Sequence, residues 1–184
     1  MSKPSRGTCV ALGALMLLAI SGHNARAVAD GRFADCFWIC NVSAATLGIG
    51  WLLRSPNCCA AGGIWLLPGT LVWLADVGLA GSSIIATSYP VHLGGSVLAL
   101  AAARWLGSPP GGWRWALALL AATLLVSRFA LPAAANINAA HHVPPGWQAL
   151  GSSRLVFVIN AVLLSLISAR FVGFGLNALG RRRT

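Results

Sequence analysis

The sequence contains little charge and almost no acid. Its 184 residues include no glutamate and only three acidic side chains, and charged residues make up 9% of the chain against 57% hydrophobic residues. Soluble globular domains carry about 25% charged residues, so this composition excludes that class. Apolar runs recur along the whole length. We therefore expect an all-α fold, a polytopic transmembrane helix bundle.

The chain also lacks a basic domain, although its formal net charge is +10. Its Lys and Arg residues lie between apolar runs and do not form a polar segment that could bind nucleic acid. We attribute the charge to a topology bias and to affinity for anionic lipid head groups. The expected partners are membrane lipids and no nucleic acid. A membrane-protein partner or a homo-oligomer stays open.

Motifs for cofactors and metals are missing as well. The sequence has no Gly-rich phosphate loop, no haem attachment motif and no Cys-x-x-Cys. A metal site built from Asp76, His92, His141 and His142 fits poorly, because adjacent histidines lack the usual ligand spacing. We expect no cofactor and no metal.

Five apolar segments predict helices that cross a membrane, because a hydrocarbon core of about 30 Å needs roughly 20 apolar residues. Clusters of Gly, Pro, Ser and Arg separate them. The expected spans are 36–53, 59–79, 91–106, 115–131 and 155–179, and the longest polar loop, 133–154, precedes the last of them.

The N-terminus has two interpretations. A short apolar run, 9–20, follows Lys3 and Arg6, and Ala25-Arg26-Ala27 has the small-x-small form of a signal-peptidase site. Residues 1–27 are therefore either an N-terminal helix or a signal peptide, and residues 28–184 form the transmembrane bundle. The bundle has six helices in the first case and five if the N-terminal segment is cleaved.

The basic residues predict the orientation. With a cytoplasmic N-terminus, nine of the thirteen Lys and Arg residues fall on the inner side, and the outer side holds Arg26, Arg32, Arg128 and Arg154. The positive-inside rule then places the C-terminus in the cytoplasm. The expected location is a bacterial inner (cytoplasmic) membrane, crossed several times.

Polar side chains gather at one end of this predicted bundle. Its outer third contains Cys40, Asp76, His92, Asn136 and Asn138, with Arg128 and Arg154 at the border. A membrane tolerates such groups where they face a bundle interior or a water-filled cavity. Their clustering therefore marks the candidate functional site.

Three short motifs resemble those of a known family. They are Phe37-Trp38-Ile39-Cys40-Asn41 at the start of one helix, His92 at the head of another, and Asn136-Ile137-Asn138 after the penultimate helix. Over roughly 33–179 the chain resembles the YwaF-like integral membrane proteins. That family is similar to a mammalian ether-lipid acyltransferase and to the androgen-induced-gene and ADTRP lipid hydrolases. The resemblance implies a catalytic pair of Cys40 and His92.

The chemistry of these residues also suits acyl transfer. A cysteine is a nucleophile as its thiolate, and a nearby imidazole can accept the proton while a carboxylate or amide orients the ring. Cys40 and His92 would lie within about 4 Å of each other or be joined through one water, with Asp76 or an Asn of the 136/138 pair as the third group. The expected lipid- or substrate-binding residues are Arg128, Asn136, Asn138 and Arg154, of which an Arg would hold a lipid phosphate.

A non-catalytic alternative stays open. Cys40 alone suits apolar packing, His92 suits a hydrogen bond across helices, and Asn136 and Asn138 suit capping of the loop after Pro132. The polar cluster would then bind a lipid or the helices of a partner. A cavity open to the outer leaflet beside Cys40 and His92 favours the enzyme, whereas a dry interface with every polar group paired favours the structural role.

Overall fold

The fold is helical throughout the part of the chain that the computed structural model describes, which is residues 4–80, 86–143, 147–151 and 153–181, without the side chains of residues 76, 79 and 80. These residues form six α-helices and five short 3-10 or π segments, and no strand. The α-helices are α1 (Arg6–Ala29), α2 (Ile39–Leu52), α3 (Pro56–Ala80), α4 (Gly95–Trp105), α5 (Gly112–Phe129) and α6 (Arg154–Arg181). The all-α prediction is confirmed for this part of the chain.

Three of the helices are long and apolar enough to cross a membrane, namely α1, residues 56–75 of α3, and α6. The N-terminal segment forms the single helix α1, which buries Cys9, Met16 and Ile20. Two expected spans begin differently from the prediction. A 3-10 turn, η1 (Phe33–Phe37), precedes α2, and a π-helical turn, η2 (Pro90–Gly94), leads into α4.

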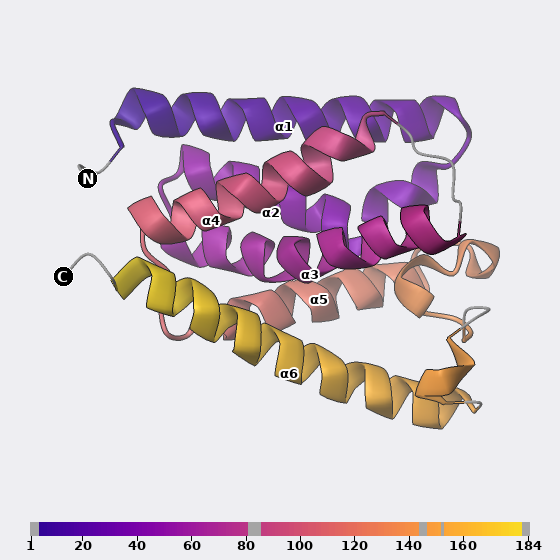
Figure 1. The fold of residues 1–184 in the computed structure, drawn as a ribbon. Helices are drawn as coiled ribbons and strands as arrows, with labels where there is room; N and C mark the ends of the chain where they lie inside the picture. Colours follow the sequence, from indigo (N-terminus) through magenta and orange to yellow (C-terminus); the bar gives the residue numbers. More distant parts are fainter. Residues whose placement is uncertain (1–3, 81–85, 144–146, 152, 182–184) are drawn as a thin grey trace.

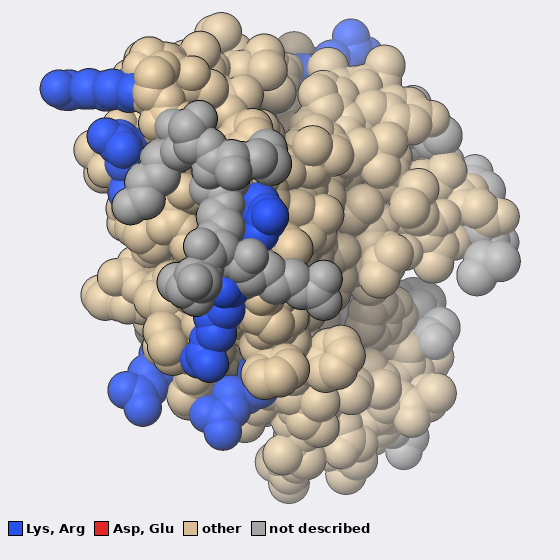
Figure 2. Space-filling view, turned by 60° about the vertical axis from the view of Figure 1, so that its left-hand side comes forward, with Lys and Arg blue, Asp and Glu red and all other residues tan. Residues whose placement is uncertain are grey.

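Successive helices run in alternating directions, so both ends of the chain lie at the same end of the bundle (Figure 1). The turns from α2 to α3 and from α4 to α5 lie at this end too, which we call the terminal end. The described part of the face in Figure 2 shows Arg side chains near this end and no Asp or Glu. The opposite end, which we call the loop end, carries η1, η2 and the segment between α5 and α6 (Figure 1).

Helices α1, α2 and α3 approach so closely that glycine is required at the contacts. A Cβ added at Gly13 of α1 would lie 2.8 Å from the carbonyl oxygen of Gly48 in α2. A Cβ at Gly62 of α3 would lie 2.5 Å from the carbonyl oxygen of Ser43 in α2. Small residues that let backbones meet are typical of helix pairs in membranes. The buried side chains of Leu47 and Trp51 fill the space around these contacts.

The contact at Gly62 predicts opposite effects for two glycine substitutions. Gly62→Ala forces a methyl group against the α2 backbone and should lower the free energy of unfolding by about 1–3 kcal/mol. Gly175→Ala meets no atom within 4 Å, so it should leave stability unchanged or raise it by up to about 1 kcal/mol through helix propensity. Reversible unfolding in mixed micelles measures both. Equal stability of the two variants would contradict the close α2–α3 contact.

Candidate functional site

Ion pairs and one amide hold the chain between α1 and α2 at the loop end. Arg26 pairs with Asp30 at 3.0 Å, and Arg32 pairs with Asp35 at 2.6 Å. The side-chain amide of Asn41, which is 3% exposed, donates to the carbonyl oxygen of Asp35 at 2.8 Å. The exposed ion pairs contribute little to stability. The buried amide fixes η1 against the first turn of α2.

Asn138 joins three segments that are distant in sequence. Its Oδ1 accepts the backbone N–H of Ile39 at 2.9 Å, and its Nδ2 donates to Phe37 O at 2.9 Å and to Ser127 Oγ at 3.0 Å. Ile39 is the first residue of α2, whose N–H groups have no partner within the helix. Asn138 has a φ of 54°, in the left-handed region that Asn tolerates better than most residues. It therefore caps α2 from the loop after α5.

Asn136 organises the same loop. Its Oδ1 accepts the backbone N–H groups of His141 at 2.9 Å and His142 at 3.0 Å, and its Nδ2 donates to His142 O at 3.0 Å. Arg128 Nη1 donates to His141 Nδ1 at 2.8 Å, so the other ring nitrogen carries the proton and donates to Ser127 O at 3.0 Å. The loop is thus closed onto the end of α5.

The four residues expected to bind lipid therefore lie at one end, as predicted, but they bond to the protein itself. Arg154 Nη2 also donates to a backbone carbonyl, that of Ala140, at 2.6 Å. Both polar atoms of the Asn136 and Asn138 amides take part in these bonds. Arg128 and Arg154 keep further N–H donors, because a guanidinium has five. Ser127 was not expected in this network, and an isolated serine in an apolar helix gives no signal of it.

His92 lies in the middle of the π turn η2 and is 6% exposed. Its ring stacks on Trp73 of α3 with 4.8 Å between ring centroids and 1° between planes. Thr70, also on α3, donates from its hydroxyl to His92 O at 3.0 Å. His92 Nδ1 is buried and has no hydrogen-bond partner among the described residues. Such turns are frequent at functional sites, and this one holds the imidazole rigidly.

Cys40 lies in the first turn of α2, against the same stretch of α3. A Cβ added at Gly69 would lie 3.9 Å from Cys40 Cβ, and Gly69 precedes Trp73 by one turn on the same helix face. Helix α2 also contacts η2 directly. Cys40 and His92 therefore flank Gly69–Trp73 from two neighbouring segments.

The two side chains are not hydrogen-bonded to each other in the described residues. Cys40 Sγ donates to Asn41 Oδ1 at 3.8 Å instead. Asp76, the expected third member, lies on α3 three residues after Trp73, but its side chain lies outside the described residues. The roles of Trp73 in stacking and of Thr70 in holding η2 had no sequence signal, since both depend on how α3 is rotated.

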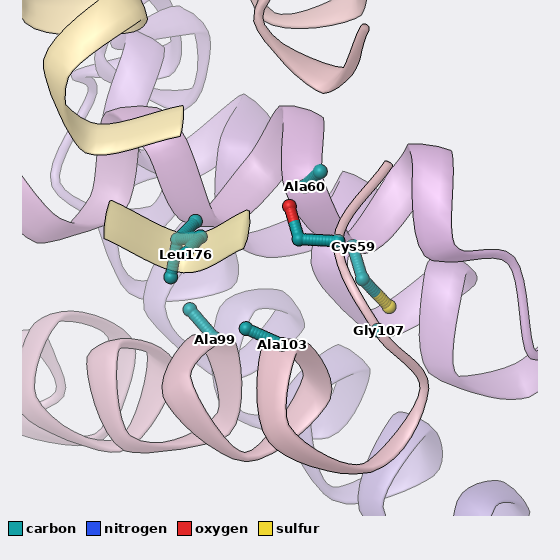
Figure 3. Close-up of a pocket in the computed structure, with 7 residues that line it drawn as sticks. Cys59, Ala60, Ala99, Ala103, Gly107 and Leu176 are labelled. Carbon is teal, nitrogen blue, oxygen red and sulfur yellow. The ribbon is translucent and has the colours of Figure 1, made fainter. Parts of the chain in front are cut away.

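A narrow hollow lies at the opposite end of the molecule, where α3 begins and α4 and α6 end (Figure 3). It is too narrow to hold a water molecule. Its lining is Cys59, Ala60, Ala99, Ala103, Gly107, Ser108 and Leu176. This mostly apolar hollow is remote from Cys40 and His92, so it adds nothing to their chemistry.

The cysteines are free thiols, and the described residues contain no group of three His, Cys, Asp or Glu side chains that could hold a metal. Cys36, in η1, donates to Asn24 O at 3.8 Å. Burial and the neighbouring Asp35 carboxylate raise the pKa of the Cys36 thiol. Because its thiol bonds to α1 and lies in η1 rather than in α2, Cys36 is a suitable positional control for Cys40.

The bonds of Asn138 predict that its loss opens the loop end. Asn138→Ala removes three hydrogen bonds and places alanine at a left-handed φ, so we expect a loss of about 2–4 kcal/mol of unfolding free energy. Asn138→Gly loses the same bonds without the steric cost and should be more stable than the alanine variant by about 1 kcal/mol. Unfolding in mixed micelles measures both. Wild-type stability of the alanine variant would show that Asn138 does not cap α2.

Comparison with known proteins leaves this geometry as the basis for assigning a function. No family model matches the sequence, and neither a curated protein nor a solved structure matches it.

Proposed function

We propose that the chain is a six-helix protein of a bacterial inner membrane with both termini in the cytoplasm. The three long apolar helices and the alternating helix directions support this placement. Helix α5 has 18 residues and is about 27 Å long, close to the thickness of a hydrocarbon core. Arg6, Arg54, Arg114 and Arg181 lie in the turns or helix ends of the terminal end, which would be the cytoplasmic side.

We further propose that Cys40 and His92 act as nucleophile and base in lipid acyl transfer or hydrolysis, as the resemblance to the YwaF-like family implies. The observation that carries this proposal is the buried His92 Nδ1 without a described partner. A buried polar atom without a hydrogen bond costs about 1–3 kcal/mol, so it marks a place where a partner is expected. Helix α2 contacts η2, and its one thiol is that of Cys40, which lies beside Gly69.

The reaction would proceed in two steps. His92 takes the proton of Cys40 Sγ, and the thiolate attacks the carbonyl carbon of a lipid ester. The tetrahedral intermediate collapses to an acyl thioester on Cys40, and the departing alkoxide takes the proton from the imidazolium. Water or the hydroxyl of a second lipid then attacks the thioester while His92 accepts its proton. The C–S bond breaks to release the acid or the new ester, and the Cys40 thiolate takes the proton back from the imidazolium. Asp76 remains the candidate for orienting the ring, because the amides of Asn136 and Asn138 are already bonded.

A second candidate function is a non-catalytic binding role. The observation that favours it is the use of Asn136, Asn138, Arg128 and Arg154 in bonds to the protein's own backbone and His141. In that case the free Nδ1 of His92 would accept a hydrogen bond from a lipid head group or from a polar residue of a partner helix.

The proposed topology predicts the position of reporters. A reporter fused after Thr184 should read cytoplasmic, and one inserted between His142 and Gln148 should read extracytoplasmic. A combined phosphatase and fluorescent-protein fusion series measures both positions in living cells. The reverse pattern would overturn the placement of the Cys40 and His92 site near the outer leaflet.

The proposed chemistry predicts a difference between two cysteines of the loop end. Cys40→Ala and His92→Ala should each reduce formation of a hydroxylamine-sensitive acyl-enzyme from a fluorescent phospholipid by about 100-fold or more. Cys36→Ala should stay within about twofold of wild type, because Cys36 faces Asn24 O and not α3. Folded yield by size-exclusion chromatography serves as the control. Full activity of Cys40→Ala would leave the binding role as the function.

A further inference from the structure

Two arginines share one tryptophan ring where α5 and α6 meet. The guanidinium carbon of Arg170 in α6 lies 4.4 Å from the ring centroid of Trp113 in α5, and that of Arg114 lies 5.4 Å from it. The contact between the helices is close here, because a Cβ added at Gly173 would lie 3.4 Å from Trp113 Cβ. The Trp113 ring is thus fixed between α5 and α6 with two cations on it.

These two cations have no acidic neighbour. No Asp or Glu follows Asp76 in the sequence, so α5 and α6 contain none. Among the described residues, neither guanidinium forms a hydrogen bond or an ion pair. Two positive charges on one ring repel each other unless an anion lies between or beside them. A guanidinium stacked on a ring keeps its N–H groups at the edge, where they fit the oxygens of a phosphate.

The depth of this group matches one surface of a membrane. From Trp113 to Phe129 and from Arg170 back to Arg154, each helix extends about 24 Å towards the loop end. Arg114 and Arg170 are both exposed, and Trp side chains are enriched at the interface between hydrocarbon and head groups. The group therefore lies at the level of the phosphates of the leaflet at the terminal end.

The surface that extends from this group towards the loop end is apolar. On α6, Leu163 is 51% exposed, Ile167 64% and Phe171 77%. Most apolar residues of α6 between 155 and 167 are exposed, and only 11% of its membrane-length stretch is buried. Acyl chains would cover such a surface, since exposed apolar side chains are stable where lipid surrounds them.

We propose that Trp113, Arg114 and Arg170 form a binding site for the phosphate of an anionic phospholipid in the leaflet at the terminal end, with the acyl chains lying along α6. This inference rests on the proposed membrane placement and is independent of any reaction at Cys40 and His92. The lipid would join α5 to α6 where they diverge towards the loop end (Figure 1).

Native mass spectrometry of the purified full chain, titrated with phosphatidylglycerol or phosphatidylcholine, tests the site. Wild type should bind phosphatidylglycerol at least 10-fold more tightly than phosphatidylcholine. The double variant Arg114→Gln/Arg170→Gln should lose about 30-fold in affinity for phosphatidylglycerol, and each single variant about fivefold, since one basic residue near an anionic surface contributes about that factor. Both residues are exposed, so the variants should fold.

The matched control is Arg6→Gln/Arg54→Gln, which removes the same charge at the same end but near α1 and α2. It should stay within about twofold of wild type. An equal loss in both double variants, or equal binding of the two lipids by wild type, would overturn the site. Displacement of the lipid by equimolar glycerol phosphate would assign the site to a soluble anion instead. Extraction of wild type from vesicles by alkaline carbonate would refute the membrane placement itself, a result distinct from the loss of lipid preference.

Discussion

The backbone contact of α2 with its two neighbours is the constraint on which the rest of the structure depends. Gly13 and Gly48 bring α1 onto α2, and Gly62 brings α3 onto α2, at distances that leave no room for a methyl group. In the proposed membrane placement the helices have no hydrophobic drive to associate, so van der Waals contact of this kind would hold them together. The contact also sets the axial position of α2 relative to α3, and thereby places Cys40 beside Gly69.

A second requirement then shapes the loop end. The first N–H groups of a helix have no partner within the helix and need one elsewhere. Asn138 provides one for Ile39, and the amide of Asn41 bonds the preceding turn. Most polar side chains of the loop end therefore bond to the protein's own loops and helix ends. His92 differs, because the π turn and the Trp73 stack position its ring while Nδ1 remains without a described partner.

Composition and spacing were sufficient to predict the helical class, the order of the helices and the gathering of Asn136, Asn138, Arg128 and Arg154 at one end. They could not predict which side of each helix faces inward, because a helix that is apolar all round carries no periodic signal. The contact of Gly62 with the α2 backbone depends on how the helices are rotated, and a glycine in an apolar run gives no signal of it. The rotation of each helix about its axis also determines two contacts of the site. These are the stack of His92 on Trp73 and the hydrogen bond of Asn138 to Ile39, 99 residues away.

Cross-linking between positions 40 and 92 tests most directly whether α2 and η2 bring the proposed pair together. In a chain with the other four cysteines replaced by alanine, His92→Cys should form a short methanethiosulfonate cross-link to Cys40 in native membranes, detected by mass spectrometry. The matched chain also carries His92→Cys, but it keeps Cys36 and has Cys40→Ala. We predict a rapid cross-link from Cys40 and little or none from Cys36. A cross-link from Cys36 that forms as fast, or none from Cys40, would contradict the pairing of Cys40 with His92.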